Sequence, residues 1–369
     1  MLTDFLLASA AALAASALAC RGMIAAGVLD GPTAERKREN APTPASGGVA
    51  IGIGFALGLV LLLFPPVRAW SAGLAPSQAL SALAAIALAF FFLAVGAIDD
   101  VRPIESKVKF ALFALASLAG PILGLRAELM PLGVGLDLHL PYLAAVLGSA
   151  LFVFTLTNAV NFMDGANGLA MGSVAIANFF LGWLALMSGQ PATAALAFCG
   201  AAALAGFLFW NLPAGRLFAG DSGALFAGAV AAFTSLLYLA ESGASPLLPA
   251  MLFFPLLADV LLTLAYRLGK GEPLLEGHRD HLYQVAIRAG MSHVGASLRY
   301  WLLTALCGMI ALAAAAVARG DLAFLVRLGP FDQTLRAIAS YAPTAAFVAL
   351  IAASLILEKR VRALEKALP

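Results

Sequence analysis

Two adjacent carboxylates, Asp99 and Asp100, stand at the end of a long apolar run, and Lys109 follows within a few helical turns. A pair of neighbouring carboxylates is costly to remove from water, so it is expected where it binds a metal ion or accepts a proton. Neutralisation by the lysine in a purely structural ion pair is the alternative interpretation.

Four polar residues recur at every third position of another apolar stretch: Asn158, Asn161, Asp164 and Asn167. On a helix this spacing places the side chains along one slowly drifting face. Gly165 interrupts that helix and exposes backbone N–H groups. Packing alone does not explain so many polar side chains, although a hydrogen-bonded seam between membrane helices is the structural alternative.

Asp221 lies in a Gly-Asp-Ser-Gly segment that opens a further apolar run. An aspartate at or near a helix N-terminus is surrounded by N–H donors that also favour phosphate groups. A simple helix-capping aspartate would have the same local sequence.

A short basic cluster in the first polar loop includes Arg36 and Lys37. Two prolines and a Gly47-Gly48 pair follow it, which suits a stiff loop that holds an anion close to the backbone. Anchoring of the loop on the cytoplasmic side by its positive charge is the alternative.

Three of the 4 histidines fall in the last long polar loop, with Arg279 between His278 and His281. The H-x-x-H spacing is compatible with zinc, but no third ligand such as a cysteine lies close by. Phosphate binding by these three residues fits the composition of the loop better.

The elements that must position these residues are membrane-spanning helices. The chain has 369 residues, of which 62% are hydrophobic and only 11% charged. A helix needs about 20 apolar residues to cross a bilayer. Eleven such runs lie near 3–28, 47–66, 78–98, 108–125, 142–158, 168–188, 193–210, 222–240, 246–267, 295–318 and 337–357. We therefore predict an all-α polytopic membrane protein of about eleven transmembrane helices, with a single integral-membrane domain over residues 1–369.

The distribution of lysine and arginine predicts the orientation. Every lysine and most arginines fall in or beside alternate loops, at 29–46, 99–107, 159–167, 211–221 and 268–294, or in the tail 358–369. These segments are expected in the cytoplasm, which leaves the N-terminus periplasmic and the C-terminus cytoplasmic. All five polar motifs then share one face, and their carboxylates and cations are those that phosphoryl transfer with Mg²⁺ requires.

Taken together and in this order, the motifs resemble those of the polyprenyl-phosphate N-acetylhexosamine-1-phosphate transferase superfamily, in its WecA-, WbpL- and TagO-like branch, related to MraY. The resemblance covers the chain from Asp30 to His281. It implies transfer of an N-acetylhexosamine-1-phosphate, or a 6-deoxy derivative, from a UDP-sugar to undecaprenyl phosphate, with release of UMP. It also implies an enzyme of the bacterial inner membrane that initiates a cell-envelope glycan such as the O-antigen of lipopolysaccharide.

Roles for individual residues follow from the same resemblance. It implies that Asp99, Asp100 and Asp221 are catalytic, with Asp99 the base toward the lipid phosphate, and that Asp221 and Asn161 bind Mg²⁺, which Mn²⁺ could replace. The substrate-binding positions that it implies are Arg36, Lys37, Lys109, Asn158, Asp164, Gly165, Asn167, His278, Arg279 and His281. One departure is Glu39, which stands where the family often has histidine in the first loop.

Three other functions fit these patterns less well than the transferase does. A secondary transporter would place its ionisable residues near the middle of the membrane, not at one face. A scaffold protein would not need the polar series between residues 158 and 167. A CDP-alcohol phosphatidyltransferase would carry a different aspartate signature. The net charge of +2, without a long basic block, argues against a nucleic-acid partner. The sequence leaves open whether the chain is a monomer or a homodimer.

Overall fold

Apolar segments of this chain fold as helices because a helix satisfies its own backbone hydrogen bonds where lipid offers none. The computed structural model describes residues 2–27, 44, 46–63, 75–133, 136–273, 279–319 and 337–366. Its helices are α1 (Leu2–Ala26), α2 (Gly47–Leu61), α3 (Pro76–Val101), α4 (Ser106–Ile122), α5 (Tyr142–Met163), α6 (Leu169–Met187), α7 (Pro191–Asn211), α8 (Gly220–Ser242), α9 (Leu247–Leu252), α10 (Phe254–Gly269), α11 (Leu282–Arg288), α12 (His293–Arg319) and α14 (Ala342–Lys366).

Eight of the described helices are long and apolar enough to cross a membrane, namely α1, α3, α5, α6, α7, α8, α12 and α14. Three further segments of the eleven expected are shorter. Helix α2 has 15 residues and α4 has 17. The expected span 246–267 is divided, because α9 ends at Leu252 and α10 starts again with Pro255 in its first turn. The membrane protein is thus polytopic and helical, and the count of eleven crossings stays a prediction.

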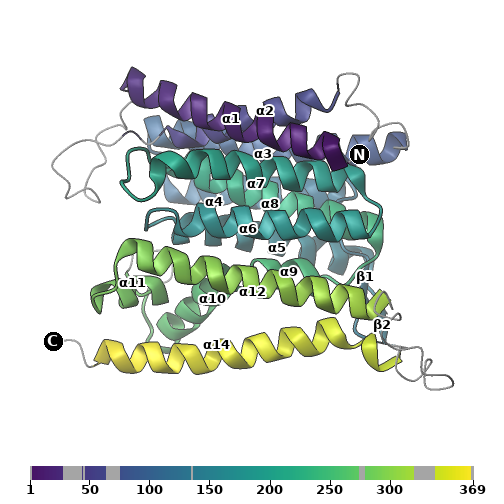
Figure 1. Ribbon diagram of the computed structural model, residues 1–369. Coiled ribbons are helices and arrows are strands. Elements are labelled where there is room, and N and C mark those ends of the chain that lie inside the picture. Colours follow the sequence, from purple (N-terminus) through teal and green to yellow (C-terminus); the bar gives the residue numbers. More distant parts are fainter. Residues whose placement is uncertain are drawn as a thin grey trace.

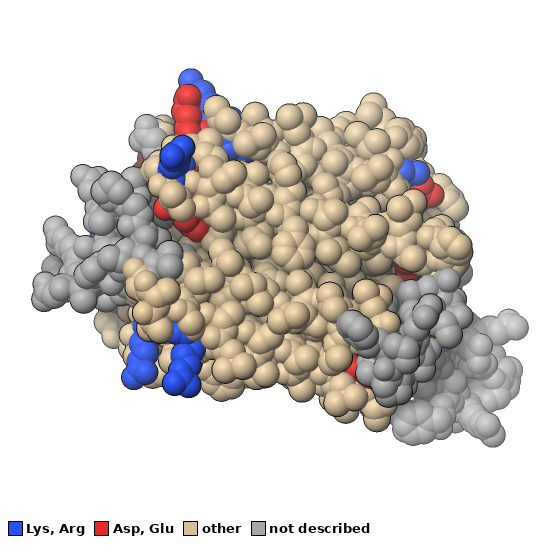
Figure 2. Space-filling model, turned by 90° about the horizontal axis from the view of Figure 1, so that it is seen from above, with Lys and Arg blue, Asp and Glu red and all other residues tan. Residues whose placement is uncertain are grey.

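The helices lie side by side, with their long axes roughly aligned (Figure 1). The start of α1 and the end of α14 lie at opposite ends of this bundle (Figure 1). On the face drawn in Figure 2, the charged side chains gather at the two ends, and the belt between them is free of Lys, Arg, Asp and Glu. This distribution suits a molecule whose middle lies in hydrocarbon and whose ends lie in water.

Helix α8 forms the centre of the bundle, because 94% of the most apolar 18-residue stretch of this helix is buried. Helix α14 lies at the edge, with 6% of the corresponding stretch buried. Small residues allow the neighbours of α8 to approach closely. A Cβ atom on Gly96 of α3 would lie 2.6 Å from the backbone N and Cα of Ser222, and one on Gly228 would lie 2.7 Å from Cα of Thr157 in α5. The ends of α3, α5 and α8 are therefore held together by direct backbone packing.

One element departs from the all-α prediction. Strands β1 (Leu129–Pro131) and β2 (Asp137–His139) form an antiparallel hairpin between α4 and α5, with Leu129 opposite His139. The hairpin lies at the same end of the bundle as the N-terminus (Figure 1), and Thr344 of α14 donates a hydrogen bond of 3.0 Å to the carbonyl of the adjacent Leu132.

Candidate functional site

A lysine joins two carboxylates at the end of the bundle where α3 finishes and α8 begins. The Lys109 Nζ atom lies 2.6 Å from Oδ2 of Asp99 and 3.3 Å from Oδ2 of Asp221. The other oxygen of Asp99 accepts a hydrogen bond of 2.7 Å from the backbone N–H of Ile104. Because the Asp99 side chain is only 9% exposed and that of Asp221 is 33% exposed, the second carboxylate is the more accessible of the two.

Asp100 points to the N-terminus of α8. Its Oδ1 accepts from the backbone N–H of Asp221 at 2.8 Å, and its Oδ2 accepts from that of Ser222 at 3.1 Å. A carboxylate here satisfies two N–H groups that have no partner within the helix and interacts favourably with the helix dipole. In the structure Asp100 therefore fixes the start of the helix that carries Asp221.

The start of α2 supports the same turn from the other side. The backbone N–H of Gly47 donates to the carbonyl of Phe218 at 3.0 Å, and that of Gly48 donates to Ala219 at 2.9 Å. A Cβ atom on Gly48 would lie 2.2 Å from the backbone nitrogen of Gly223, so only glycine fits at this position. The Gly47-Gly48 pair thus holds α8 by its backbone.

Asp164, which directly follows α5, adds another carboxyl group to this region. Desolvation, together with the negative charges of Asp221 and Asp100, raises the pKa of Asp164 well above its usual value. Among the described residues, Lys109 contacts two of the neighbouring carboxylates, those of Asp99 and Asp221. Carboxylate oxygens gathered in this way are of the type that a divalent cation prefers.

The residues near this cluster suit Mg²⁺ through the negative charge and the oxygen atoms of their side chains. Within the described ranges, no group of three or more His, Cys, Asp or Glu side chains is arranged to hold a metal ion. Mg²⁺ often uses only one or two protein carboxylates and completes its shell with water and substrate phosphates. The partly exposed Asp221 can serve as such a carboxylate, and Asn161, partly buried in the last turn of α5, carries an amide oxygen of a suitable kind.

The polar series does not lie along a single helix, because α5 ends at Met163, before Asp164 and Asn167. Asn158 is only 8% exposed, and its side-chain amide donates a hydrogen bond of 2.7 Å to the carbonyl of Phe154 on its own helix. Asn167 lies beyond the end of α5, and its amide donates to the carbonyl of Pro213 at 3.4 Å. The expected roles of both side chains in substrate binding stay a prediction, and each side chain contacts a backbone carbonyl in the structure.

The turn after α5 contacts the last predicted cytoplasmic loop. A Cβ atom on Gly165 would lie 2.2 Å from Oη of Tyr283 in α11, so a larger residue could not occupy this position without displacing the tyrosine. The rings of Phe162 and His281 lie 6.4 Å apart, and those of His281 and Tyr283 stack at 6.1 Å. His281 is thus brought next to the end of α5, as a shared site requires.

Asp259 on α10 is a buried residue of this region that our sequence reasoning missed. Its Oδ1 atom lies 3.1 Å from Nδ1 of His281. The signal in the sequence was a single carboxylate within the apolar segment PLLADVLLTL, which is costly in a membrane protein unless it has partners. We had included it in an ordinary span.

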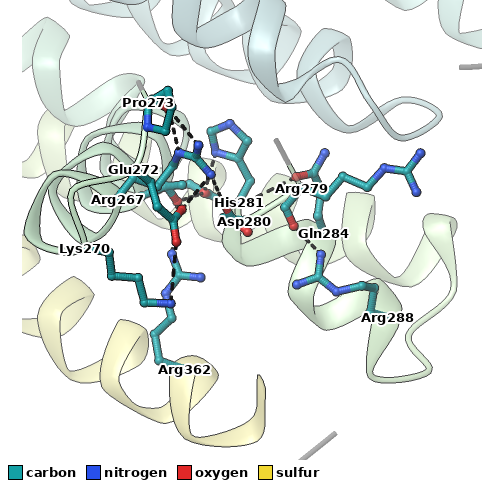
Figure 3. Close-up of polar contacts among 12 residues, drawn as sticks. Arg267, Lys270, Glu272, Pro273, Arg279, Asp280, His281, Gln284, Arg288 and Arg362 are labelled. Atoms are coloured by element: carbon teal, nitrogen blue, oxygen red, sulfur yellow. Dashed lines mark hydrogen bonds and ion pairs between the residues drawn. The ribbon is translucent and has the colours of Figure 1, made fainter. Parts of the chain in front are cut away.

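A second charged residue of α10, Arg267, contacts two residues that lie between α10 and His281, namely Pro273 and Asp280. Its guanidinium donates to the carbonyl of Pro273 from Nη2 at 2.7 Å, and it forms an ion pair with Asp280 (Figure 3). Nearby, the Arg279 carbonyl accepts a hydrogen bond from Arg288. Arg36, Lys37 and His278 lie outside the described residues.

Comparison with known proteins gives a consistent result. The model of the family described as "Glycosyl transferase family 4" matches residues 81–239, a range that includes Asp99, Lys109 and Asp221. The chain is 27% identical over 270 residues to a probable undecaprenyl-phosphate N-acetylglucosaminyl 1-phosphate transferase of Bacillus subtilis, covering 72% of each protein. It is 29% identical over 307 residues to the decaprenyl-phosphate N-acetylglucosaminephosphotransferase of Mycolicibacterium smegmatis, covering 76% of this chain and 73% of the relative. It is 30% identical over 252 residues to the phospho-N-acetylmuramoyl-pentapeptide-transferase of Moorella thermoacetica, covering 65% and 74%.

Proposed function

The chain belongs to glycosyl transferase family 4, and from this premise we propose that it transfers an N-acetylhexosamine-1-phosphate, or a 6-deoxy derivative, from a UDP-sugar to undecaprenyl phosphate. Membership of this family makes the chain a membrane enzyme that moves a sugar-1-phosphate onto a polyprenyl phosphate. The identity of the donor sugar and of the lipid is our proposal. The names of the Bacillus and Mycolicibacterium relatives favour N-acetylglucosamine as the sugar to test first.

The observation that carries the proposal is the contact of Lys109 with both Asp99 and Asp221. These residues come from three helices and meet at the end of the bundle that also holds the C-terminus of α5. Two phosphate groups brought within ~4 Å of each other repel by about 4 kcal/mol per pair of unit charges at an effective dielectric constant near 20. The Lys109 ammonium offsets part of this repulsion.

In the proposed reaction, an oxygen of the lipid phosphate attacks the β-phosphorus of the UDP-sugar. The bond between that phosphorus and the oxygen bridging to the α-phosphate breaks, and UMP leaves with the electron pair. Asp99 accepts the proton of the lipid phosphate when this group arrives protonated. Lys109 remains close to the oxygens on which negative charge develops.

We propose that Asp221 and Asn161 would hold Mg²⁺, which would supply positive charge against the charge of the diphosphate. Asp221→Asn keeps the size of the side chain and removes its charge. We expect this variant to accumulate in membranes and melt like the wild type, but to lose turnover at every Mg²⁺ or Mn²⁺ concentration. Activity near that of the wild type would contradict the assignment of the ligand.

The function itself is tested by incubating the purified protein with undecaprenyl phosphate, Mg²⁺ and a panel of UDP-sugars. We expect UMP to be released only when both substrates are present, and a lipid-linked sugar diphosphate to appear in equal amount. UMP release without the lipid would indicate hydrolysis instead of transfer. Uptake of a UDP-sugar into proteoliposomes without any release of UMP would support a transporter and contradict the proposal.

A further inference from the structure

We propose that Asp259 is a positioning residue, which holds His281 in one tautomer and one orientation for the transfer reaction. The inference rests on the proposed function, because that function gives His281 a role at the phosphates or the sugar. Asp259 is buried in α10, with only 2% of its surface exposed, and it lies in an otherwise apolar part of that helix. A carboxylate in such a position needs several hydrogen-bond donors to offset its desolvation.

The Oδ1 atom of Asp259 has three of these donors. It lies 3.1 Å from Nδ1 of His281 and accepts from the backbone N–H of Leu282 at 2.9 Å. The hydroxyl of Thr263, one turn further along α10, donates to the same oxygen at 3.2 Å. One carboxylate oxygen therefore connects α10 to the first residues of α11.

The Oδ2 atom has two donors from other elements. It accepts from the backbone N–H of Tyr283 at 3.2 Å and from the hydroxyl of Tyr300 in α12. With both oxygens counted, three helices direct hydrogen-bond donors at Asp259. A carboxylate can accept all of these bonds, whereas an asparagine would turn its NH₂ group toward donors.

This arrangement determines how His281 can act. Because an ionised carboxylate only accepts hydrogen bonds, the contact at Nδ1 requires the imidazole proton on Nδ1, and Nε2 is then the nitrogen that carries no proton in the neutral ring. The ring plane is fixed as well, since Tyr283 stacks on it at an interplanar angle of 18°. The His281 side chain is only 5% exposed, so it has little room for another orientation.

The first test measures the tautomer and does not depend on turnover. In protein labelled with ¹⁵N-histidine, the signal of His281 is identified by its loss in His281→Ala. We expect the wild type to show the proton on Nδ1 and Asp259→Asn to show a change in the tautomer ratio or in exchange broadening. An unchanged signal in Asp259→Asn would overturn the inference even if the wild type releases no UMP, in which case the proposed function fails separately.

The second test is a double-mutant cycle on UMP release. We expect Asp259→Asn to lower kcat by about 10- to 100-fold with little change in KM, as is typical for a group that orients a ligating or catalytic side chain. In the His281→Ala background, the same substitution should produce no further loss, because its effect passes through the imidazole. An equal loss in both backgrounds would reveal a purely structural role and overturn the inference.

Two other variants complete the design. Tyr300→Phe removes one donor to Asp259 and leaves the carboxylate in place, so it serves if Asp259→Asn does not fold. Tyr300→Phe should lower kcat by a smaller factor than Asp259→Asn, and this loss should also disappear in the His281→Ala background. A loss of the same size in that background would count against the inference. Asn178→Leu is the control, because Asn178 is fully buried in α6 and its side chain forms no hydrogen bond with Asp259 or His281. Its effect on kcat, if any, should be the same in both backgrounds.

Discussion

Asp100 illustrates how a residue that resembles a catalytic carboxylate can act through the helix that it caps. Both of its oxygens accept hydrogen bonds from the N-terminus of α8, and the first of these N–H groups belongs to Asp221 itself. Asp99, its neighbour in sequence, instead contacts Lys109. The two adjacent aspartates therefore have different tasks in the structure, one toward the lysine and one toward the helix.

Replacing Asp100 by alanine should reduce stability as well as activity. The substitution removes the cap of α8, and the loss of a capping side chain costs about 0.5–2 kcal/mol. We expect a lower melting temperature in detergent, measured by tryptophan fluorescence, together with a lower kcat. Asp100→Asn retains one acceptor oxygen and should lie between alanine and the wild type in both measurements. A variant that loses activity at an unchanged melting temperature would instead indicate direct contact with the substrates.

Asp164 predicts how stability depends on pH in the absence of divalent metal. Desolvation and the charges of Asp221 and Asp100 raise its pKa in the folded state. Folded protein then retains a proton that unfolded protein releases above about pH 4. Stability is therefore greatest below the unfolded pKa and falls as the pH rises toward the folded pKa. We expect Asp164→Asn to remove this contribution to the loss of stability at rising pH. At neutral pH this variant should melt at a higher temperature than the wild type.

The control for this pH series is Asp137→Asn, since Asp137 is exposed in β2, away from the cluster. Both variants and the wild type are melted between pH 4 and pH 8 in the presence of EDTA. A slope of melting temperature against pH that is the same in Asp164→Asn and in the wild type would refute the expectation.

Sequence reasoning identified the main charged residues of the site but not their partners. It grouped Asp99, Lys109 and Asp221 because they share a predicted membrane face, and the structure brings them into contact. It could not assign different contacts to Asp99 and Asp100, because the backbone amides that Asp100 contacts belong to a helix far away in the sequence. Asp259 was missed because one acidic residue hardly alters the hydropathy of a long run.

At the scale of elements, helix ends were harder to predict than helix middles. The expected span 142–158 stopped where polar residues begin, yet α5 continues to Met163, because backbone hydrogen bonds form whether or not the side chains are polar. The run 246–267 was expected as one helix, but Pro255 cannot donate the hydrogen bond that would join α10 to α9. Patterns of hydropathy do not register such breaks when all the residues around them are apolar.

The glycine contact between α3 and α8 should be essential for the position of the site. In Gly96→Ala, the new Cβ atom would lie 2.6 Å from the backbone of Ser222, so the start of α8 has to shift away from α3. A displacement of about 1 Å at a catalytic group can lower turnover ~100-fold. We expect a loss of that order in kcat, measured by UMP release, with a lower melting temperature.

Gly148→Ala is the matched control, because Gly148 also lies within a membrane helix and a Cβ atom there would meet no atom within 4 Å. Alanine favours a helix over glycine by about 1 kcal/mol, so this variant should be as stable as the wild type or more so. Equal behaviour of the two variants would contradict the view that close packing of α3 on α8 positions Asp221.

At the scale of the whole molecule, the bundle separates its charged groups into two ends. The site lies where α3 ends and α8 begins, and this is also the end at which α14 finishes (Figure 1). The hairpin and the start of α1 lie at the other end. A polyprenyl substrate that stays in the bilayer can therefore reach the site only from one side of the membrane, which makes the orientation part of the function.

The orientation can be tested with single cysteines, because the three native cysteines, Cys20, Cys199 and Cys307, are all buried. We place one new cysteine at each end of the bundle, as Asp137→Cys in the exposed strand β2 and as Lys270→Cys after α10, where the lysine side chain is 51% exposed. The positive-inside rule puts the first position outside and the second in the cytoplasm. In intact cells stripped of their outer envelope, a membrane-impermeant maleimide should label only Asp137→Cys. Lys270→Cys should react only after permeabilisation, and the unmodified chain should stay unlabelled in both conditions. Labelling of Lys270→Cys in intact cells would show that the orientation is the opposite one. The carboxylate cluster would then lie on the outer side, away from cytoplasmic UDP-sugars.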